Sequence, residues 1–330
     1  MPTHVSLLGI FGNAILPVLA IGAVGFLLGR LTGIEVGGLN TVAVYVLAPA
    51  LVFHSIVTTG LTGETLLTVG LGVAAFTVTM TVVAEGIGRA LGEREPLLSA
   101  FVLACVFSNS GNYGLPLSAF AFGTTGRSTA AIFMTAQSVL IYTLGAYVAA
   151  RSSGEDGLAG ARRVLTIPLV YAVLAAVAVR WLSLAPPEGG TVMSTVGMVG
   201  DAAIPIMLLI LGVELANTDY GAALSRVGRP VAVKTFLAPV VGLGVALVLS
   251  TVGPLGLSFG DPAVARTFVL ETSTPTAVTP LILLIEFGDD TAVGGVSAAE
   301  YVSTTVLVAA VVSVPVLTVL ISLLRSGALL

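Results

Sequence analysis

The stretch that decides the fold is Ser108-Asn109-Ser110-Gly111-Asn112-Tyr113-Gly114-Leu115-Pro116-Leu117, a polar interruption of an apolar run. A second interruption, Thr272-Ser273-Thr274-Pro275-Thr276-Ala277-Val278-Thr279-Pro280-Leu281, follows at an offset of 164 residues, from 108 to 272 and from 116 to 280. Proline removes a backbone donor and clashes with the preceding helical turn, while glycine and asparagine tolerate conformations that end a helix. We therefore expect both segments to be broken near their middles.

The composition of the chain places these two breaks in a membrane. Of the 330 residues, 56% are hydrophobic and only 9% are charged, and the mean hydropathy is +1.07. An ordinary soluble domain has about 25% charged residues, so a soluble globular protein is excluded. An outer-membrane barrel needs segments of alternating polarity, and the apolar runs here do not alternate. The sequence predicts a helical bundle surrounded by membrane lipid, with no nucleic-acid partner because basic and aromatic residues do not cluster.

Apolar runs of about twenty residues, bounded by charge, glycine or proline, predict ten membrane-spanning helices. The one clearly polar connection, residues 151–163, divides them into two sets of five. Because five is odd, the second set must enter the membrane in the opposite sense, as in the inverted repeats of secondary transporters. We expect an all-α polytopic membrane protein with a single membrane domain: a first five-helix repeat over 1–150, a cytoplasmic connecting loop over 151–163, and a second, inverted five-helix repeat over 164–330. The predicted spans are 6–29, 37–59, 65–88, 97–123, 128–150, 164–184, 191–216, 231–252, 263–287 and 298–324.

The basic residues predict the orientation, because Lys and Arg concentrate in cytoplasmic connections. With the amino terminus outside, nine of them fall on the cytoplasmic side and four on the outer side. This favours a multi-pass protein of the cell membrane with both termini outside. The nine are Arg30, Arg89, Arg94, Arg151, Arg162, Arg163, Arg226, Arg229 and Lys234, and the four are Arg127, Arg180, Arg266 and Arg325.

Two helix breaks in matching places indicate a central binding site. Backbone groups freed at membrane depth are tolerated only where protein or a water-filled cavity surrounds them. The helices that resume near Leu117 and Leu281 would present free amides, and the positive ends of their dipoles, to an anion such as a carboxylate. Amide and phenol side chains can donate to the same ligand. The candidate substrate-binding residues are Asn109, Asn112, Tyr113, Gly114, Pro116, Pro275, Thr276 and Pro280.

Glu271 stands beside the second break, about nine residues into its predicted span, where a charge without partners costs about 2.5–3.5 kcal/mol. Three interpretations are open: a carboxylate that couples transport to a cation or proton, a protonated carboxyl that makes a structural hydrogen bond, or a shallower position. In the first, the hydroxyls of Thr272 and Ser273 join the carboxylate around sodium, which prefers oxygen ligands, or around a proton. Asp201, one turn before Pro205, is the second candidate for coupling, unless it lies near the outer interface.

Three further polar residues need an interpretation: Asn109 and Gln137 each have two, and Lys234 has one. Asn109 either binds substrate or satisfies backbone groups freed by the break, and Gln137 either faces the pathway or packs in the interior. Lys234 is expected near a segment end, where its long side chain reaches the interface.

These residues resemble the auxin efflux carrier (AEC) family, which includes the PIN-type auxin carriers, over nearly the whole chain. The run Ala48-Pro49-Ala50-Leu51-Val52-Phe53 looks like the family's second helix, and Asn109 to Leu117 is similar to its Asn/Gly/Pro crossover. Ala203 to Leu208 resembles its seventh helix. The resemblance implies ten helices as two inverted five-helix repeats, with broken crossover helices 4 and 9 and with transport of organic anions. We expect spans 1, 2, 6 and 7 to form a scaffold and the surface of a homodimer.

One departure from the family concerns the residues before the second break. Glu271-Thr-Ser-Thr-Pro275 looks more like the Glu-Thr-Gly opening of the crossover in sodium/bile acid symporters of the same fold class. That resemblance argues against a uniporter or simple proton coupling. We expect sodium or a proton as the coupling ion, no resident cofactor, and no metal site other than one for sodium at Glu271.

We therefore predict a secondary active transporter that moves a small organic anion by alternating access, and not an enzyme. Motifs for phosphate-binding loops, metalloproteases or nucleophile elbows do not occur. The rivals are a sodium-coupled bile-acid-type symporter, an intramembrane enzyme with Asp201 and Glu271 as a proteolytic pair, and a channel or sensor. Dicarboxylates, branched or aromatic carboxylates and bile-acid-like molecules all remain candidates for the substrate. The single cysteine, Cys105, excludes an internal disulfide.

Overall fold

The computed structural model describes residues 16–34, 36–58, 61–152, 168–187, 189–217, 222–251, 258–289 and 291–330. Within these ranges the regular structure is helical, and the extended residues form two isolated bridges and no β-strand. Most of the predicted connecting loop over 151–163 and the beginning of the first predicted span lie outside the described residues.

Six helices in the described part of the chain are long and apolar enough to cross a membrane. The longest of them, with 42 residues, folds back on itself at Gly123, whose φ of 61° lies in the left-handed region. A Cβ atom at Gly126 would collide with the carbonyl of Ser118, which is about 12 Å away along a straight helix. This range therefore contains the end of the fourth predicted span and all of the fifth. The six ranges are Gly37–Thr58, Gly63–Ala90, Ser110–Arg151, Thr191–Ile210, Gly228–Thr251 and Ala298–Arg325.

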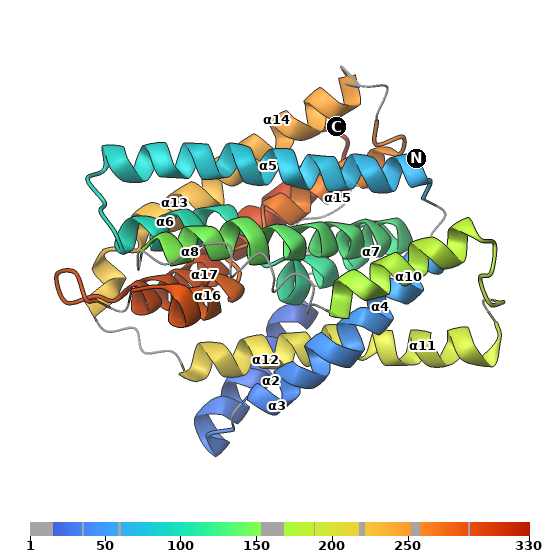
Figure 1. Cartoon of the computed structure of the whole chain (residues 1–330), viewed down its shortest axis with the longest axis horizontal. Coiled ribbons are helices and arrows are strands. Elements are labelled where there is room, and N and C mark those ends of the chain that lie inside the picture. Colours follow the sequence, from blue (N-terminus) through green and yellow to red (C-terminus); the bar gives the residue numbers. More distant parts are fainter. Residues whose placement is uncertain are drawn as a thin grey trace.

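The helices pack as two sets, which Figure 1 shows one above the other. In the scaffold set, as we call it, α2 lies against α12, and α4 lies against α10 and α11. These helices correspond to predicted spans 1, 2, 6 and 7, so the predicted grouping is confirmed. The scaffold set consists of α2 (Leu16–Thr32), α3 (Gly37–Val42), η2 (Ala43–Leu47), α4 (Ala48–Thr58), α10 (Pro168–Trp181), α11 (Thr191–Asp201) and α12 (Ala203–Asn217).

Glycines allow the scaffold helices to approach closely. A Cβ atom at Gly25 or Gly212 would collide with backbone of the facing helix, α12 or α2, and one at Gly200 would lie 2.7 Å from the Cα of Leu51 on α4. Small residues are the usual means of close packing between helices in lipid, where apolar burial alone gives little attraction.

The second set, which we call the crossover set, contains the two interrupted segments. Here α15 packs against α7 and α14, and α5 packs against α6, α7 and α14. This set consists of α5 (Gly63–Ala90), α6 (Leu97–Val106), η3 (Ser110–Gly114), α7 (Leu115–Leu140), η4 (Ile141–Gly145), α8 (Ala146–Arg151), η6 (Ala222–Ser225), α13 (Gly228–Ala232), η7 (Val233–Leu237), α14 (Ala238–Thr251), α15 (Pro262–Thr272), α16 (Thr279–Phe287) and α17 (Ala298–Arg325).

The two sets meet mainly along α7 and the π-helical turn η3. Helix α7 packs against α4 and α10, and η3 packs against α12. The first polar interruption therefore lies at the boundary between the sets, while the second lies deeper in the crossover set.

Candidate functional site

The two interruptions meet and satisfy each other's backbone groups. Helix α6 ends at Val106 and α15 ends at Thr272, and the extended residues that follow pair through an antiparallel bridge between Ser108 and Thr276. The amide of Asn109 donates to the carbonyl of Pro275 at 2.7 Å, and the amide of Ala277 donates to the carbonyl of Phe107 at 3.0 Å. We call residues 107–109 and 273–278 the crossing. Pairing of this kind lets extended backbone exist at membrane depth.

The side chain of Gln137 on α7 holds one side of the crossing. Its amide oxygen accepts from the backbone N–H of Ser108 at 3.1 Å, and its amide nitrogen donates to the Ser108 carbonyl at 2.7 Å. Gln137 is buried. Of its two interpretations, the structure therefore shows the one in which Gln137 packs in the interior.

Asn109 also forms hydrogen bonds with backbone groups of the break. Its Oδ1 accepts from the amide of Asn112 at 3.2 Å, and its carbonyl accepts from the amide of Gly114 at 2.8 Å. Gly111 and Asn112 are only half-buried, whereas Tyr113 and Gly114 are buried. Because η3 packs against α12, the half-buried pair lies beside the boundary between the two sets.

The remaining predicted substrate-binding residues lie in the interior of the protein, in or near the crossing. Pro116, Pro275, Thr276 and Pro280 are all buried. The hydroxyl of Thr276 donates to the carbonyl of Ala104 at 2.8 Å and so ties the second interruption to α6.

Glu271 lies in the last turn of α15 and is fully buried. Its Oε1 accepts a hydrogen bond of 2.6 Å from the hydroxyl of Ser118, in the first turns of α7. Its Oε2 has no hydrogen-bond partner among the described residues. A Cβ atom at Gly114 would collide with this carboxyl group, so glycine makes room for it. The carboxyl group thus has one free acceptor beside the first break.

The hydroxyls expected beside Glu271 have other partners. Thr272 and Ser273 donate to the carbonyl of Val269, at 2.9 and 2.6 Å. Hydroxyls near a helix end commonly donate to a carbonyl three or four residues earlier, and that local bond competes with a longer-range one. The hydroxyl that does donate to Glu271 belongs to Ser118, which is 153 residues away in sequence.

Lys234 lies in the interior, and its expected position near a segment end is wrong. The continuous helical range that contains it begins at Gly228, so Lys234 lies deeper than the predicted span implied. It is fully buried, and its Nζ donates to the Ser108 hydroxyl at 2.7 Å and to the Thr272 carbonyl at 3.3 Å. The ammonium also lies 5.8 Å from the ring centroid of Phe76. Without Lys234, eight basic residues instead of nine remain on the predicted cytoplasmic side.

Asp201 is exposed and has a partner of its own. It is the last residue of α11, 64% of its side chain is exposed, and it forms an ion pair with Arg127 of α7. The ion pair joins the scaffold set to the crossover set.

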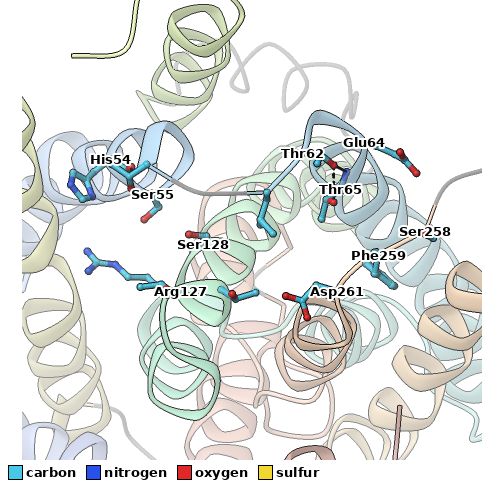
Figure 2. Close-up of a pocket in the computed structure, with 15 residues that line it drawn as sticks. His54, Ser55, Thr62, Glu64, Thr65, Arg127, Ser128, Ser258, Phe259 and Asp261 are labelled. Atoms are coloured by element: carbon cyan, nitrogen blue, oxygen red, sulfur yellow. Dashed lines mark hydrogen bonds between the residues drawn. The ribbon is translucent and has the colours of Figure 1, made fainter. Parts of the chain in front are cut away.

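A cavity of about 760 Å³, which Figure 2 shows, is lined in part by Arg127 of this ion pair. It is formed where the ends of α4, α5 and α15 meet the fold-back of α7, and its lining includes His54, Ser55, Arg127, Ser128 and Asp261. The sequence analysis did not find this cavity. Its residues come from connections far apart in sequence, and the only local signal was the abundance of Ser and Thr there.

The described residues contain no group of three or more His, Cys, Asp or Glu side chains that could hold a metal ion. The polar groups described at the crossing and the cavity include backbone dipoles, hydroxyls, amides, the buried side chains Glu271 and Lys234, and the Arg127–Asp201 ion pair.

Comparison with known proteins finds similarity along nearly the whole chain. A family model described as membrane transport protein matches residues 10–164 and 161–321. The chain is 28% identical over 327 residues to a protein of Rhizobium meliloti (strain 1021) named "Putative malonate transporter", covering 96% of each chain. It is 26% identical over 313 residues to a protein of Methanothermobacter thermautotrophicus named "Uncharacterized transporter", covering 94% of this chain and 98% of that protein.

Proposed function

We propose, from the premise that this chain belongs to the membrane transport protein family, that it is a secondary carrier that moves a small organic anion across the cell membrane by alternating access. This is the family of auxin-efflux-carrier-like proteins that the sequence resembles. The chain is a multi-pass membrane protein, and its relatives are named transporters.

The observation that carries the proposal is the position of the first break, next to the crossing, at the boundary of the two helix sets. Gly111 and Asn112 are half-buried where η3 packs against α12. Rigid-body motion of the crossover set against the scaffold set would expose this point to one side of the membrane and then to the other. An anion held there by the Asn112 amide and by the first amides of α7 would be carried between the two sides.

We also propose that the fold is the ten-helix inverted repeat. Two observations support it. Ser108 and Thr272, which occupy the same position in the two polar stretches, make a hydrogen bond to each other, and the scaffold set gathers the helices of spans 1, 2, 6 and 7. The arrangement would put both termini outside and the 151–163 connection in the cytoplasm.

The substrate class we favour is a short carboxylate. The free amides of a helix start and an uncharged amide side chain suit a carboxylate group, and one relative carries the name malonate transporter with the word "putative" before it. Malonate and other short dicarboxylates are therefore the first compounds to test.

Coupling to sodium or a proton is proposed at Glu271. Its Oε2 is free to accept a proton or to bind a cation, since its only described partner is Ser118 on the other oxygen. Either species would neutralise the carboxylate beside the first break, where the anion is proposed to bind. Cation binding would then strengthen anion binding, and by linkage the anion would strengthen cation binding equally.

The rival interpretations receive less support. A proteolytic pair would need Asp201 and Glu271 to act together, but Asp201 is exposed and paired with Arg127, while Glu271 is buried and bonded to Ser118. A bile-acid-type symporter shares the proposed coupling and differs in the size of its substrate.

The test is uptake by purified protein in proteoliposomes, with labelled malonate, succinate, benzoate and taurocholate under imposed sodium or proton gradients. We expect a short carboxylate to accumulate above its outside concentration when one gradient is present. Protein-free liposomes and liposomes without a gradient are the controls. If no acid enters faster than in protein-free liposomes, or if the protein instead conducts single-channel currents, the proposal is wrong.

A further inference from the structure

We propose that Arg127 is a second carboxylate-binding site, separate from the crossing, and that Asp201 occupies it as an internal competitor. The arriving anion would replace Asp201 on Arg127 and so release the scaffold set from the crossover set. This inference rests on the proposed function for the identity of the ligand, a small organic carboxylate, but it concerns a different part of the molecule.

The first observation is that the Arg127–Asp201 pair connects the two helix sets. Arg127 lies on α7 just after the fold-back at Gly123, and Asp201 ends α11 of the scaffold set. The other ion pairs of the described residues, which involve Glu85, Glu93 and Glu95, stay inside the crossover set. Breaking the Arg127–Asp201 pair therefore removes a direct ionic link between the sets.

The second observation is that the guanidinium has donors left over. A guanidinium carries five N–H donors and binds carboxylates best through two of them at once. Asp201 accepts from Nη2, while the Nε of Arg127 is buried and has no acceptor among the described residues. A buried donor without an acceptor is unfavourable, so the Nε of Arg127 is available to a carboxylate other than that of Asp201.

The third observation is a buried hydroxyl in the same part of the cavity. Ser55 is 3% exposed, lines the cavity, and its Oγ has no hydrogen-bond partner among the described residues. Figure 2 shows Ser55 and Ser128 between the side chains of Arg127 and His54. This end of the cavity therefore offers a cation, an imidazole and hydroxyl donors to an anion.

The acidic side chains of the cavity do not occupy that end. Figure 2 shows Glu64 pointing away from Arg127, and Asp261 lies on the opposite side beside Phe259. Asp261 already accepts from the amide of Ala263 at 2.7 Å, where it caps α15. The carboxylate nearest to Arg127 among the described residues of this cavity region is thus its partner Asp201.

The exposure of the pair suits an exchangeable contact. The side chain of Asp201 is 64% exposed and that of Arg127 is 26% exposed. Ion pairs between exposed groups are weak because water competes for both charges, so a free carboxylate at sufficient concentration can replace Asp201. A fully buried pair would not exchange in this way, since separating it would leave a buried charge alone.

The experiment compares Asp201→Asn with Arg127→Gln in malonate binding by purified protein and in malonate uptake. Asp201→Asn removes the competitor, so the concentration of malonate for half-saturation should fall, by up to about fivefold for an exposed pair. Arg127→Gln removes the guanidinium, so that concentration should rise by about tenfold or more. The double variant should behave like Arg127→Gln, and Arg127→Lys, which keeps the charge without the planar fork, should lie between.

Glu64→Gln is the matched control. Glu64 is a carboxylate of the same cavity, but it points away from Arg127, so its removal should leave malonate binding unchanged.

If Asp201→Asn and Arg127→Gln shift binding in the same direction, the pair is only structural and the proposal is wrong. Absence of saturable malonate binding to the Asp201→Asn protein would also overturn it. Binding that follows the predicted order without any transport would refute the carrier and keep this site. Transport that is unchanged in all four Arg127 and Asp201 variants would refute this site and keep the carrier.

Discussion

Ser108 and Thr272 touch each other, since the hydroxyl of Ser108 donates to the carbonyl of Thr272 at 3.2 Å. They are separated by 164 residues, which is the offset that relates the two polar stretches in sequence. Equivalent positions of two stretches come into contact when the stretches cross near a common axis. The ammonium of Lys234 binds the hydroxyl of one and the carbonyl of the other, so a single side chain holds both halves of the crossing.

The first prediction concerns this ammonium. No ion pair of the described residues includes Lys234, and a buried charge without an opposite charge is unfavourable to the fold. Lys234→Met, of similar length, should therefore keep or raise the apparent Tm in detergent, while malonate uptake falls at least about tenfold because the two halves lose their common donor. Lys234→Arg, which retains a cation, is the control. A parallel loss of Tm and uptake in Lys234→Met would mean that the lysine is a structural tie alone.

The second prediction concerns the space around Glu271. Gly114→Ala would place a methyl group against the Glu271 carboxyl, and overpacking of this kind costs about 1–3 kcal/mol. We expect a lower apparent Tm and loss of uptake. Gly86→Ala, at an exposed helical glycine with no atom within 4 Å of the added methyl group, should stay within about 1 kcal/mol of the wild type. Equal stabilities for both variants would show that the Glu271 carboxyl does not lie against Gly114.

The third prediction concerns the amide that brackets Ser108. Gln137→Met removes the acceptor of the Ser108 N–H and one of two donors to the Ser108 carbonyl, which keeps the Ser110 amide at 2.8 Å. A buried N–H left without an acceptor costs about 1–3 kcal/mol. Thermal unfolding should show a clear loss of stability. Ser138→Ala, the adjacent residue, removes only a hydroxyl bonded to its own helix at Met134, so its effect should be much smaller. A loss for Ser138→Ala as large as that for Gln137→Met would contradict the bracketing role.

The fourth prediction concerns coupling. Glu271→Gln keeps an oxygen that can accept from Ser118 and mimics the neutral acid, so the protein should fold and exchange labelled malonate across the membrane. Accumulation against a gradient should stop, because no proton or cation can be bound and released at an amide. Uptake in vesicles with imposed sodium or proton gradients measures this. If Glu271→Gln still concentrates malonate with the wild-type dependence on both ions, the carboxyl group is structural.

The fifth prediction concerns orientation, for which the chain offers a favourable background. Cys105 is the only cysteine and is buried, so a new cysteine can be labelled selectively. In intact cells, a membrane-impermeant maleimide should label Thr62→Cys, at an exposed position beside the cavity, and should not label Ser153→Cys in the connecting loop. The reverse pattern would place both termini in the cytoplasm.

The helical membrane class and the two breaks were predictable from the sequence, because they depend on local properties. Composition sets the preference for lipid, and proline, glycine and polar residues interrupt a helix wherever they occur. The breaks near Ser108 and Pro275 and the grouping of spans 1, 2, 6 and 7 therefore appear in the structure. The partners of Glu271 were not predictable, since Thr272 and Ser273 are its neighbours in sequence, whereas Ser118 is its neighbour only in space.

By itself, the sequence determined that the chain is a helical membrane protein and where two of its helices open, because these properties are carried by residues adjacent along the chain. Only the tertiary structure decided that Lys234 lies inside the crossing and that Arg127 meets Asp201 beside a cavity. Lys234 and Arg127 have long side chains, and the partner of each depends on how two helices are rotated and offset against each other. That arrangement follows from packing of the whole bundle, which residue spacing within one segment does not specify.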